Sequence, residues 1–143
     1  FLQLKELQKS QNQDTGFDAY LHPKAQIELG LELVDIASSA IDISDGLIQD
    51  LNLICKSSDV GADVHLSMIP TSVENKTLEL INSGDDYQIC FTASEDKSAK
   101  VNNISERLGV PITEIGKITN TRELTLFDHE GNKMDLESGY SHF

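Results

Sequence analysis

The stretch AIDISDGL, residues 40–47, decides the fold, because a predicted strand turns into a predicted helix within it. Residues 38–43, SSAIDI, are predicted to form a short buried strand. Residues 45–56 follow with helical periodicity, and their inward positions are Leu47, Leu51, Ile54 and Cys55. Asp42, Ser44 and Asp45 therefore fall at the junction between a strand end and a helix start.

Strand and helix patterns also flank this junction on both sides. Upstream, Pro23 opens a predicted helix whose apolar stripe consists of Ile27, Leu31 and Val34. Downstream, Ser94 is the expected N-cap of a helix that Gly109 closes. The remaining predicted elements are strands at 62–66, 87–92 and 111–119, a short helix at 77–81, and a hairpin formed by 124–127 and 133–136. This order predicts an α+β fold rather than a doubly wound sheet.

The composition is that of an ordinary globular domain, with 143 residues, 38% hydrophobic and 24% charged. A formal net charge of −13 argues against binding to nucleic acid or to an anionic membrane, and it permits divalent cations as partners. Cys55 and Cys90 lack CxxC spacing. They are predicted to be buried reduced thiols, which favours a cytoplasmic setting.

The three polar residues of the junction allow two interpretations. Ser44 or Asp45 could cap the helix by accepting hydrogen bonds from its first N–H groups, with no ligand involved. A cap needs only one such residue, however, and Asp42 on the strand side cannot cap the same helix end. Two carboxylates this close repel unless a cation neutralises them, and a helix N-terminus favours phosphate oxygens. The stretch therefore indicates a magnesium–phosphate site, while capping remains the alternative.

Two further segments carry candidate residues. The segment SGDDYQ, residues 83–88, is either a solvated turn or a second acidic contribution to the site, and at most one of its two Asp side chains can face Asp42. The segment GYSHF, residues 139–143, is either a frayed terminus or a place where Tyr140 stacks on a flat ring or docks on the core. The sequence contains no GxGxxG, Walker-type or HExxH motif.

Five segments occur in an order that resembles the thiamine-monophosphate kinases: SSAIDISDGLIQDL, VGADVHLSMIP, SGDDYQICFTA, IGKITN and GYSHF. DISDGL alone is shared with the wider aminoimidazole ribonucleotide synthetase superfamily. The resemblance implies that residues 20–143 form the C-terminal α+β domain of that superfamily, a mixed β-sheet packed with helices. It also implies that residues 1–19 are the remnant of an inter-domain helix and linker, with the N-terminal ATP-binding and dimerisation domain absent.

These kinases transfer a phosphoryl group from ATP to thiamine monophosphate, which yields thiamine diphosphate. The resemblance implies Asp42 and Asp45 as magnesium ligands, Ser44 as an ATP-phosphate contact, and Asp85 and Tyr140 as contacts of thiamine monophosphate. It implies several Mg²⁺ ions, direct in-line transfer, a homodimeric full-length protein, and no activity for residues 1–143 alone. The alternatives are another ATP-dependent enzyme of the superfamily, or a non-catalytic binding domain.

Overall fold

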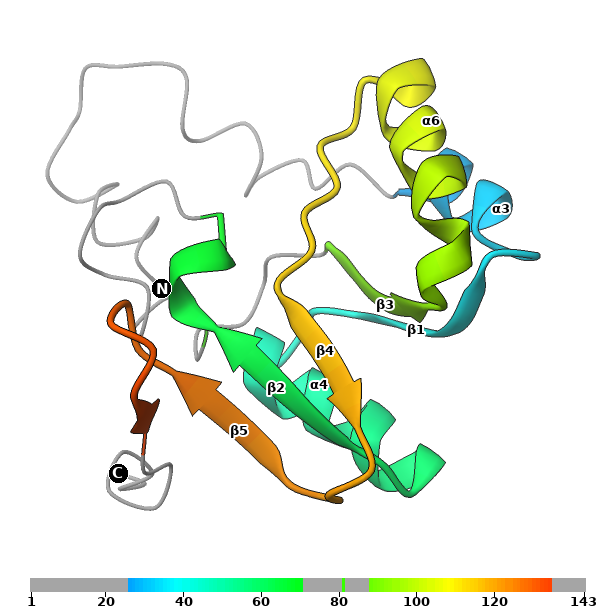
Figure 1. Ribbon diagram of the computed structural model, residues 1–143. Helices are drawn as coiled ribbons and strands as arrows, with labels where there is room; N and C mark the ends of the chain where they lie inside the picture. The colour runs from blue at the N-terminus through cyan, green and yellow to red at the C-terminus, as the bar shows by residue number, and fades with distance from the viewer. Residues whose placement is uncertain (1–25, 71–80, 82–87, 135–143) are drawn as a thin grey trace, which may run out of the picture. The chain divides into compact units, whose positions relative to one another are not determined.

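The computed structural model describes residues 26–70, 81 and 88–134 (Figure 1). The chain divides into two compact units: the first contains residues 1–51 and 79–112, and the second contains residues 52–78 and 113–143. Both units combine helices with strands, so the predicted α+β class is confirmed. No helix among the described residues is long and apolar enough to cross a membrane.

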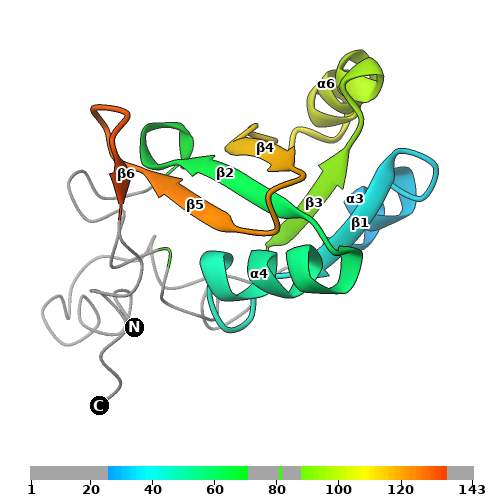
Figure 2. The ribbon, with the colours of Figure 1, turned by 60° about the horizontal axis from the view of Figure 1, so that its bottom comes forward.

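The first unit is built on a pair of antiparallel strands. Its described elements are α3 (Ile27–Glu32), β1 (Ala37–Asp42), the start of α4 (Leu47–Ser58), β3 (Ile89–Ala93), the 3₁₀ turn η2 (Glu95–Lys97) and α6 (Ser98–Leu108). Figure 2 shows β1 and β3 side by side, and Ile41 lies opposite Cys90 in their register. The strand predicted at 38–43 is thus confirmed to within one residue at each end.

The core of the first unit forms between α3, α6 and the strand pair. Leu29, Leu33 and Ile104 are its buried members, and Ile89 and Phe91 of β3 pack against them. Ile89 and Phe91 lie on one face of β3, and Cys90, between them in sequence, lies on the opposite face, where it is buried. Both faces of β3 are therefore largely covered, as expected for a strand of this apolar composition.

The predicted apolar stripe of the first helix is wrong. Ile27, Leu31 and Val34 are 67%, 69% and 70% exposed, whereas Leu29 and Leu33 are buried. Both sets have helical spacing, so periodicity alone could not choose between them. The helix ends at Glu32, after six residues, and the pair formed by Leu29 and Leu33 is the one that packs against Ile104 of α6.

The sequence predicted the C-terminal end of α6 correctly, but not the capping bond at its N-terminal end. Ser94 occupies the N-cap position of η2, the turn that leads into α6, as predicted, but its side chain makes no capping bond, because its hydroxyl donates to the Asp96 carboxylate instead. Gly109 ends the helix as predicted, with a left-handed φ of 62°. The N–H groups of Gly109 and Val110 donate to the last-turn carbonyls of Glu106 and Ser105, which is a Schellman motif.

The second unit contains a four-stranded mixed sheet. Its elements, after the end of α4, are β2 (Gly61–His65), the 3₁₀ turn η1 (Leu66–Met68), β4 (Gly116–Thr119), β5 (Leu124–Phe127) and β6 (Lys133–Met134). The strand order is β4-β2-β5-β6, with β2 antiparallel to β4 and parallel to β5 (Figure 1). The prediction of a mixed sheet is confirmed, and so is the hairpin between β5 and β6.

Two predicted elements need correction or fall outside the described chain. The strand predicted at 111–119 begins only at Gly116, where a Cβ atom would stand 2.0 Å from the carbonyl oxygen of Asp63 on β2. Glycine thus allows β4 to approach β2 closely. The helix predicted at 77–81 lies outside the described residues apart from Ile81, which is buried.

The helix predicted at 45–56 is confirmed as α4, and all four of its predicted inward residues are buried.

Candidate metal-binding loop

The acidic loop, defined as residues 42–46, connects the end of β1 to the start of α4 within the first unit. Asp42 lies opposite Ile89 at the last register position of β1, and the N–H of Ile43 then donates to the carbonyl oxygen of Gln88 at 2.8 Å. Ile43 is buried, which anchors the loop between its polar neighbours. Asp42, Ser44 and Asp45 are all exposed, so the loop presents three polar side chains to solvent.

A carboxylate that the sequence analysis missed holds this loop together. Asp50, on the first turns of α4, is 1% exposed, and its Oδ2 atom accepts hydrogen bonds from three successive backbone N–H groups. The donor–acceptor distances are 2.9 Å from Ser44, 3.1 Å from Asp45 and 3.2 Å from Gly46. The N–H of Asp50 also donates to the carbonyl oxygen of Gly46 at 3.0 Å. Gly46 has a φ of 136°, a region that favours glycine, and this conformation allows the turn.

The contacts of Asp50 argue against the interpretation that Ser44 or Asp45 serves only to cap the helix. Within the described residues, the Ser44 and Asp42 side chains make no hydrogen bond or ion pair, and Asp45 accepts only a 3.4 Å bond from the Gln49 amide. Among the described residues, therefore, neither the Ser44 nor the Asp45 side chain caps α4. The loop N–H groups that a phosphate would otherwise bind are occupied by Asp50. What remains available at the loop is two carboxylates and one hydroxyl.

A signal for Asp50 was present in the sequence. Asp50 lies between the buried residues Ile48 and Leu51 on the apolar side of α4, where an acidic residue is unexpected unless its carboxylate is hydrogen-bonded. Its position four residues after Gly46 places it one helical turn below the loop. A charged residue in the buried stripe of a helix that follows an Asp-Gly turn would therefore have predicted this arrangement.

Two further site residues were predicted, one in the segment 83–88 and one in the segment 139–143. Asp85 and Tyr140 lie outside the described residues. Among the residues that are described, no group of three or more His, Cys, Asp or Glu side chains is arranged to hold a metal ion. Asp42 and Asp45 therefore supply at most part of a coordination sphere.

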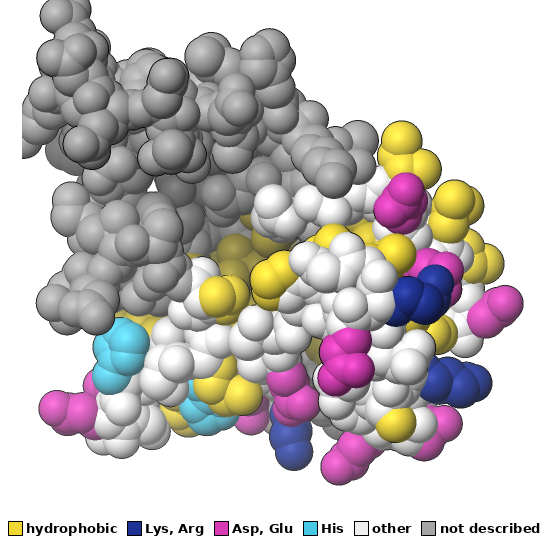
Figure 3. Space-filling view, turned by 90° about the horizontal axis from the view of Figure 1, so that it is seen from above, with side chains coloured by type: hydrophobic (Ala, Val, Ile, Leu, Met, Phe, Trp, Pro, Cys, Tyr) yellow, Lys and Arg dark blue, Asp and Glu magenta, His cyan; other side chains and the backbone are white. Residues whose placement is uncertain are grey.

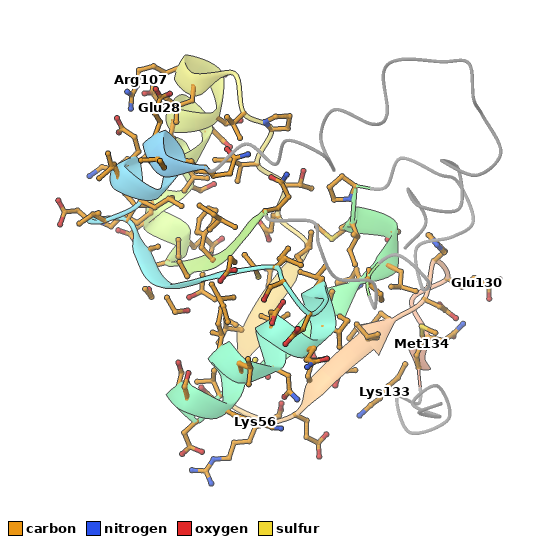
Figure 4. All side chains as sticks on the ribbon, turned by 180° about the vertical axis from the view of Figure 1, so that it is seen from behind. Glu28, Lys56, Arg107, Glu130, Lys133 and Met134 are labelled. Atoms are coloured by element: carbon orange, nitrogen blue, oxygen red, sulfur yellow. The ribbon has the colours of Figure 1, made fainter. Side chains whose placement is uncertain are left out.

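Three basic side chains of the described regions form ion pairs, and none of their partners belongs to the acidic loop. In the first unit, Arg107 of α6 holds Glu32 of α3 with two bonds of 2.9 and 2.6 Å, and Figure 4 shows Arg107 beside α3. This contact lowers the pKa of Glu32 below its usual value, mainly through the hydrogen bond from Arg107. In the second unit, Lys133 lies 3.6 Å from Glu123. On the face seen in Figure 3, acidic side chains are more widespread than basic ones.

The two cysteines are both buried and free of disulfides, as predicted. Burial raises the pKa of the Cys55 thiol above its ordinary value, which lowers the fraction of reactive thiolate. An aromatic pair lies in the second unit, where the rings of His65 and Phe127 stack with centroids 4.8 Å apart at the ends of β2 and β5. Cys55 lies on α4, Cys90 on β3, His65 on β2 and Phe127 on β5, so none of these four side chains belongs to the acidic loop.

Comparison with known proteins gives consistent matches. The family model described as AIR synthase related protein, C-terminal domain, matches residues 1–129. The thiamine-monophosphate kinase of Escherichia coli O157:H7 is 39% identical over 133 residues, which cover 87% of this chain and 41% of that protein. The crystal structure of thiamine-monophosphate kinase from Stenotrophomonas maltophilia K279a superimposes with a TM-score of 0.80 at 27% identity, covering 92% of this chain and 46% of that one. AaThiL complexed with AMPPCP and TMP shares the fold, with a TM-score of 0.70 at 23% identity over 93% of this chain and 44% of that one. The chain thus spans less than half the length of the relatives that it matches.

Proposed function

The chain belongs to the family of AIR synthase related proteins, whose C-terminal domain it contains, and on this premise we propose that it is the C-terminal part of a thiamine-monophosphate kinase. Such an enzyme transfers the terminal phosphoryl group of ATP to thiamine monophosphate. Residues 20–143 would be its C-terminal α+β domain, and residues 1–19 the connection to an N-terminal domain. The identity of 39% to a curated thiamine-monophosphate kinase favours this substrate over those of other superfamily enzymes.

The observation that carries the proposal is that, among the described residues, the side chains of Asp42 and Ser44 make no hydrogen bond and that of Asp45 accepts only the 3.4 Å bond from Gln49. Asp50 satisfies the loop N–H groups, so Asp42 and Asp45 are exposed without a structural task there. Mg²⁺ is commonly held by one or two carboxylates, substrate phosphates and water, rather than by a cage of protein ligands. Two carboxylates therefore suit an ion that arrives with ATP, and the donor set fits a hard cation. Asp42 and Asp45 would bind Mg²⁺, and the Ser44 hydroxyl would donate a hydrogen bond to an ATP phosphate.

The position of Gln88 supports the proposed role of Asp85. The bond from the Ile43 N–H ties the Gln88 carbonyl to the acidic loop at 2.8 Å. Asp85 precedes Gln88 by three residues, so even an extended chain keeps their Cα atoms within about 11 Å of each other. This short separation along the chain is compatible with the proposed contact between Asp85 and a substrate held at the loop. The proposed contact between Tyr140 and the thiamine ring rests on the sequence resemblance alone.

The proposed chemistry needs positioning and charge neutralisation more than acid–base groups. The attacking oxygen belongs to the substrate's own phosphate and is already anionic near neutral pH, so no strong general base is required. When bound, Mg²⁺ supplies neutralisation of the phosphate charges. Asp42 and Asp45 orient the phosphates through the ions that they bind, and Ser44 fixes one phosphate oxygen. These roles suit a direct in-line transfer.

The test joins this chain to the N-terminal half of the 39% identical E. coli relative and measures ADP formation with thiamine monophosphate. Asp42→Asn is expected to lower kcat at least about 100-fold, because it removes a ligand charge that acts in the transition state. Asp35→Asn is the matched control, since Asp35 is also an exposed carboxylate but lies before β1. The unjoined chain is expected to be inactive. Turnover of a ribonucleotide amide in place of thiamine monophosphate, or full activity of the Asp42 variant, would count against the proposal.

Two further properties are part of the proposal. The full-length protein would be a cytoplasmic homodimer that binds ATP and thiamine monophosphate. A non-catalytic binding domain is the competing function, and calorimetry separates the two. That domain would bind neither Mg²⁺ nor thiamine diphosphate at the acidic loop.

A further inference from the structure

We propose that Asp50 is a positioning residue that makes the acidic loop accept phosphate only as a metal complex. Its carboxylate fills the backbone N–H groups of residues 44–46, which would otherwise attract a bare anion. The inference rests on the proposed metal-binding function of Asp42 and Asp45 and deepens it, because it specifies the form in which the nucleotide is recognised. It assigns to Asp50 an indirect action, through the loop that carries those side chains.

The geometry shows how completely the N–H groups are used. Three successive N–H donors converge on the single Oδ2 atom within 3.2 Å, and the residue is 1% exposed, so water does not compete for them. Hydrogen bonds to an ionised acceptor are roughly twice as strong as neutral ones. The backbone of residues 44–46 is therefore held in place by the Asp50 carboxylate of α4. The side chains of Ser44 and Asp45 remain exposed to solvent.

The electrostatic consequence is that this turn favours cations, whereas a turn with open backbone N–H groups usually favours anions. Successive backbone N–H groups at the start of a helix form an anion-binding concavity, as in phosphate-binding loops. Here that concavity holds the molecule's own carboxylate, and Asp42 and Asp45 add two more carboxyl groups within the same nine residues. No Lys or Arg of the described residues forms an ion pair with any of the three. A bare phosphate is repelled by this loop, and a divalent cation is attracted to it.

The alternative is that Asp50 only stabilises the fold. Asp50→Asn separates the two roles, because Asn has the same size and can still accept the loop N–H bonds well enough to keep the fold. As a neutral acceptor it holds them only about half as strongly as a carboxylate, so an added phosphate can displace it from these N–H groups. A purely structural role predicts that cation and phosphate binding weaken together or not at all. The positioning role predicts that they change in opposite directions.

The experiment uses the complete 143-residue chain and follows backbone amide signals by NMR. In one titration Mn²⁺ is the probe, and broadening at residues 42–46 reports binding. In the other, inorganic phosphate is added with a chelator present. We expect Asp50→Asn to weaken Mn²⁺ binding about tenfold and to produce phosphate-dependent shifts at residues 44–46 that the unmodified chain lacks. Asp35→Asn removes one exposed carboxylate elsewhere and is expected to change neither titration.

Each outcome bears on a separate proposal. Unchanged Mn²⁺ affinity and no phosphate shift in a folded Asp50→Asn chain would overturn the inference. Phosphate shifts at residues 44–46 of the unmodified chain would overturn it too, and that measurement needs no variant. Absence of Mn²⁺ broadening at Asp42 and Asp45 in the unmodified chain would instead refute the metal site of the proposed function. The phosphate titration would still decide the role of Asp50.

Discussion

Truncation of Leu29 tests which face of α3 holds the first unit together. Leu29 is 5% exposed and packs with Leu33 and Ile104, whereas Leu31, two residues along the same helix, is 69% exposed. Replacing a buried leucine by alanine costs the transfer free energy of the lost methyl groups plus the energy of the cavity left behind. Measured losses run from about 2 to 5 kcal/mol. We expect Leu29→Ala to lower the free energy of unfolding by about 3 kcal/mol, and Leu31→Ala to change it by less than about 0.5 kcal/mol.

The assay is urea unfolding followed by far-UV circular dichroism, because the chain has no tryptophan. With a slope of about 2 kcal/mol per molar urea, Leu29→Ala lowers the unfolding midpoint by about 1.5 M. Leu31→Ala is a matched control, since both changes have the same effect on helix propensity. If Leu29→Ala has no folded baseline, Ile104→Val removes one methyl group from the same cluster and should cost about 1 kcal/mol. Equal losses in the two leucine variants, or a larger loss for Leu31→Ala, would refute the core that we describe.

Two further predictions concern a salt bridge and a pair of glycines. Arg107 depresses the pKa of Glu32, so the pair's contribution to stability is complete above the unfolded pKa of about 4.3 and disappears as the pH falls through the lower folded value. The melting temperatures of the unmodified chain and Glu32→Gln should therefore differ at pH 7 and converge in acid, and a constant difference would contradict this. Gly116→Ala should destabilise the second unit by more than about 2 kcal/mol through its clash with Asp63, whereas Gly30→Ala in α3, which meets only ordinary contact at 4.0 Å, should stabilise by up to about 1 kcal/mol in the same urea assay. A loss of stability in both glycine variants would show that the tight contact is not the cause.

The sequence correctly predicted those helices and strands whose residue pattern is compatible with only one structure. The helix that begins at Leu47 was predicted from the helical periodicity of its apolar residues, and the hairpin was predicted from the turn residues 128–132, DHEGN, between residues 124–127 and 133–136. The first helix failed because two stripes with the same spacing exist, and only the packing partner on α6 distinguishes Leu29 from Leu31. Ser94 stands at the predicted N-cap position but makes no capping bond with its side chain, for a local reason. The short Asp96 side chain competes for the hydroxyl, and propensity does not include that competition.

The candidate site was predicted in part. Asp42, Ser44 and Asp45 were chosen because their residue types and their place at a strand–helix junction suit a hard cation, and the structure places all three on one exposed loop. Asp50 was missed because the helix was judged by its apolar positions, and the buried acidic residue among them was passed over. Its three partners are backbone groups, which have no signal of their own in the sequence.

The spacing of the acidic loop follows from three separate physical requirements. The register of β1 ends the strand at Asp42, opposite Ile89, so the first carboxylate stands at the sheet's end. The chain must then turn within four residues, and the φ of 136° at Gly46 makes that turn possible. One helical turn later, Asp50 is the first residue whose N–H can reach the Gly46 carbonyl, at 3.0 Å, and this bond brings its carboxylate beneath the three loop N–H groups. A shift of Asp50 by one residue would rotate its side chain by about 100° and break all three bonds. The number of residues between Asp42 and Asp50 is thus fixed by backbone geometry, and the backbone that carries the exposed carboxylates of Asp42 and Asp45 depends on a residue that is itself buried.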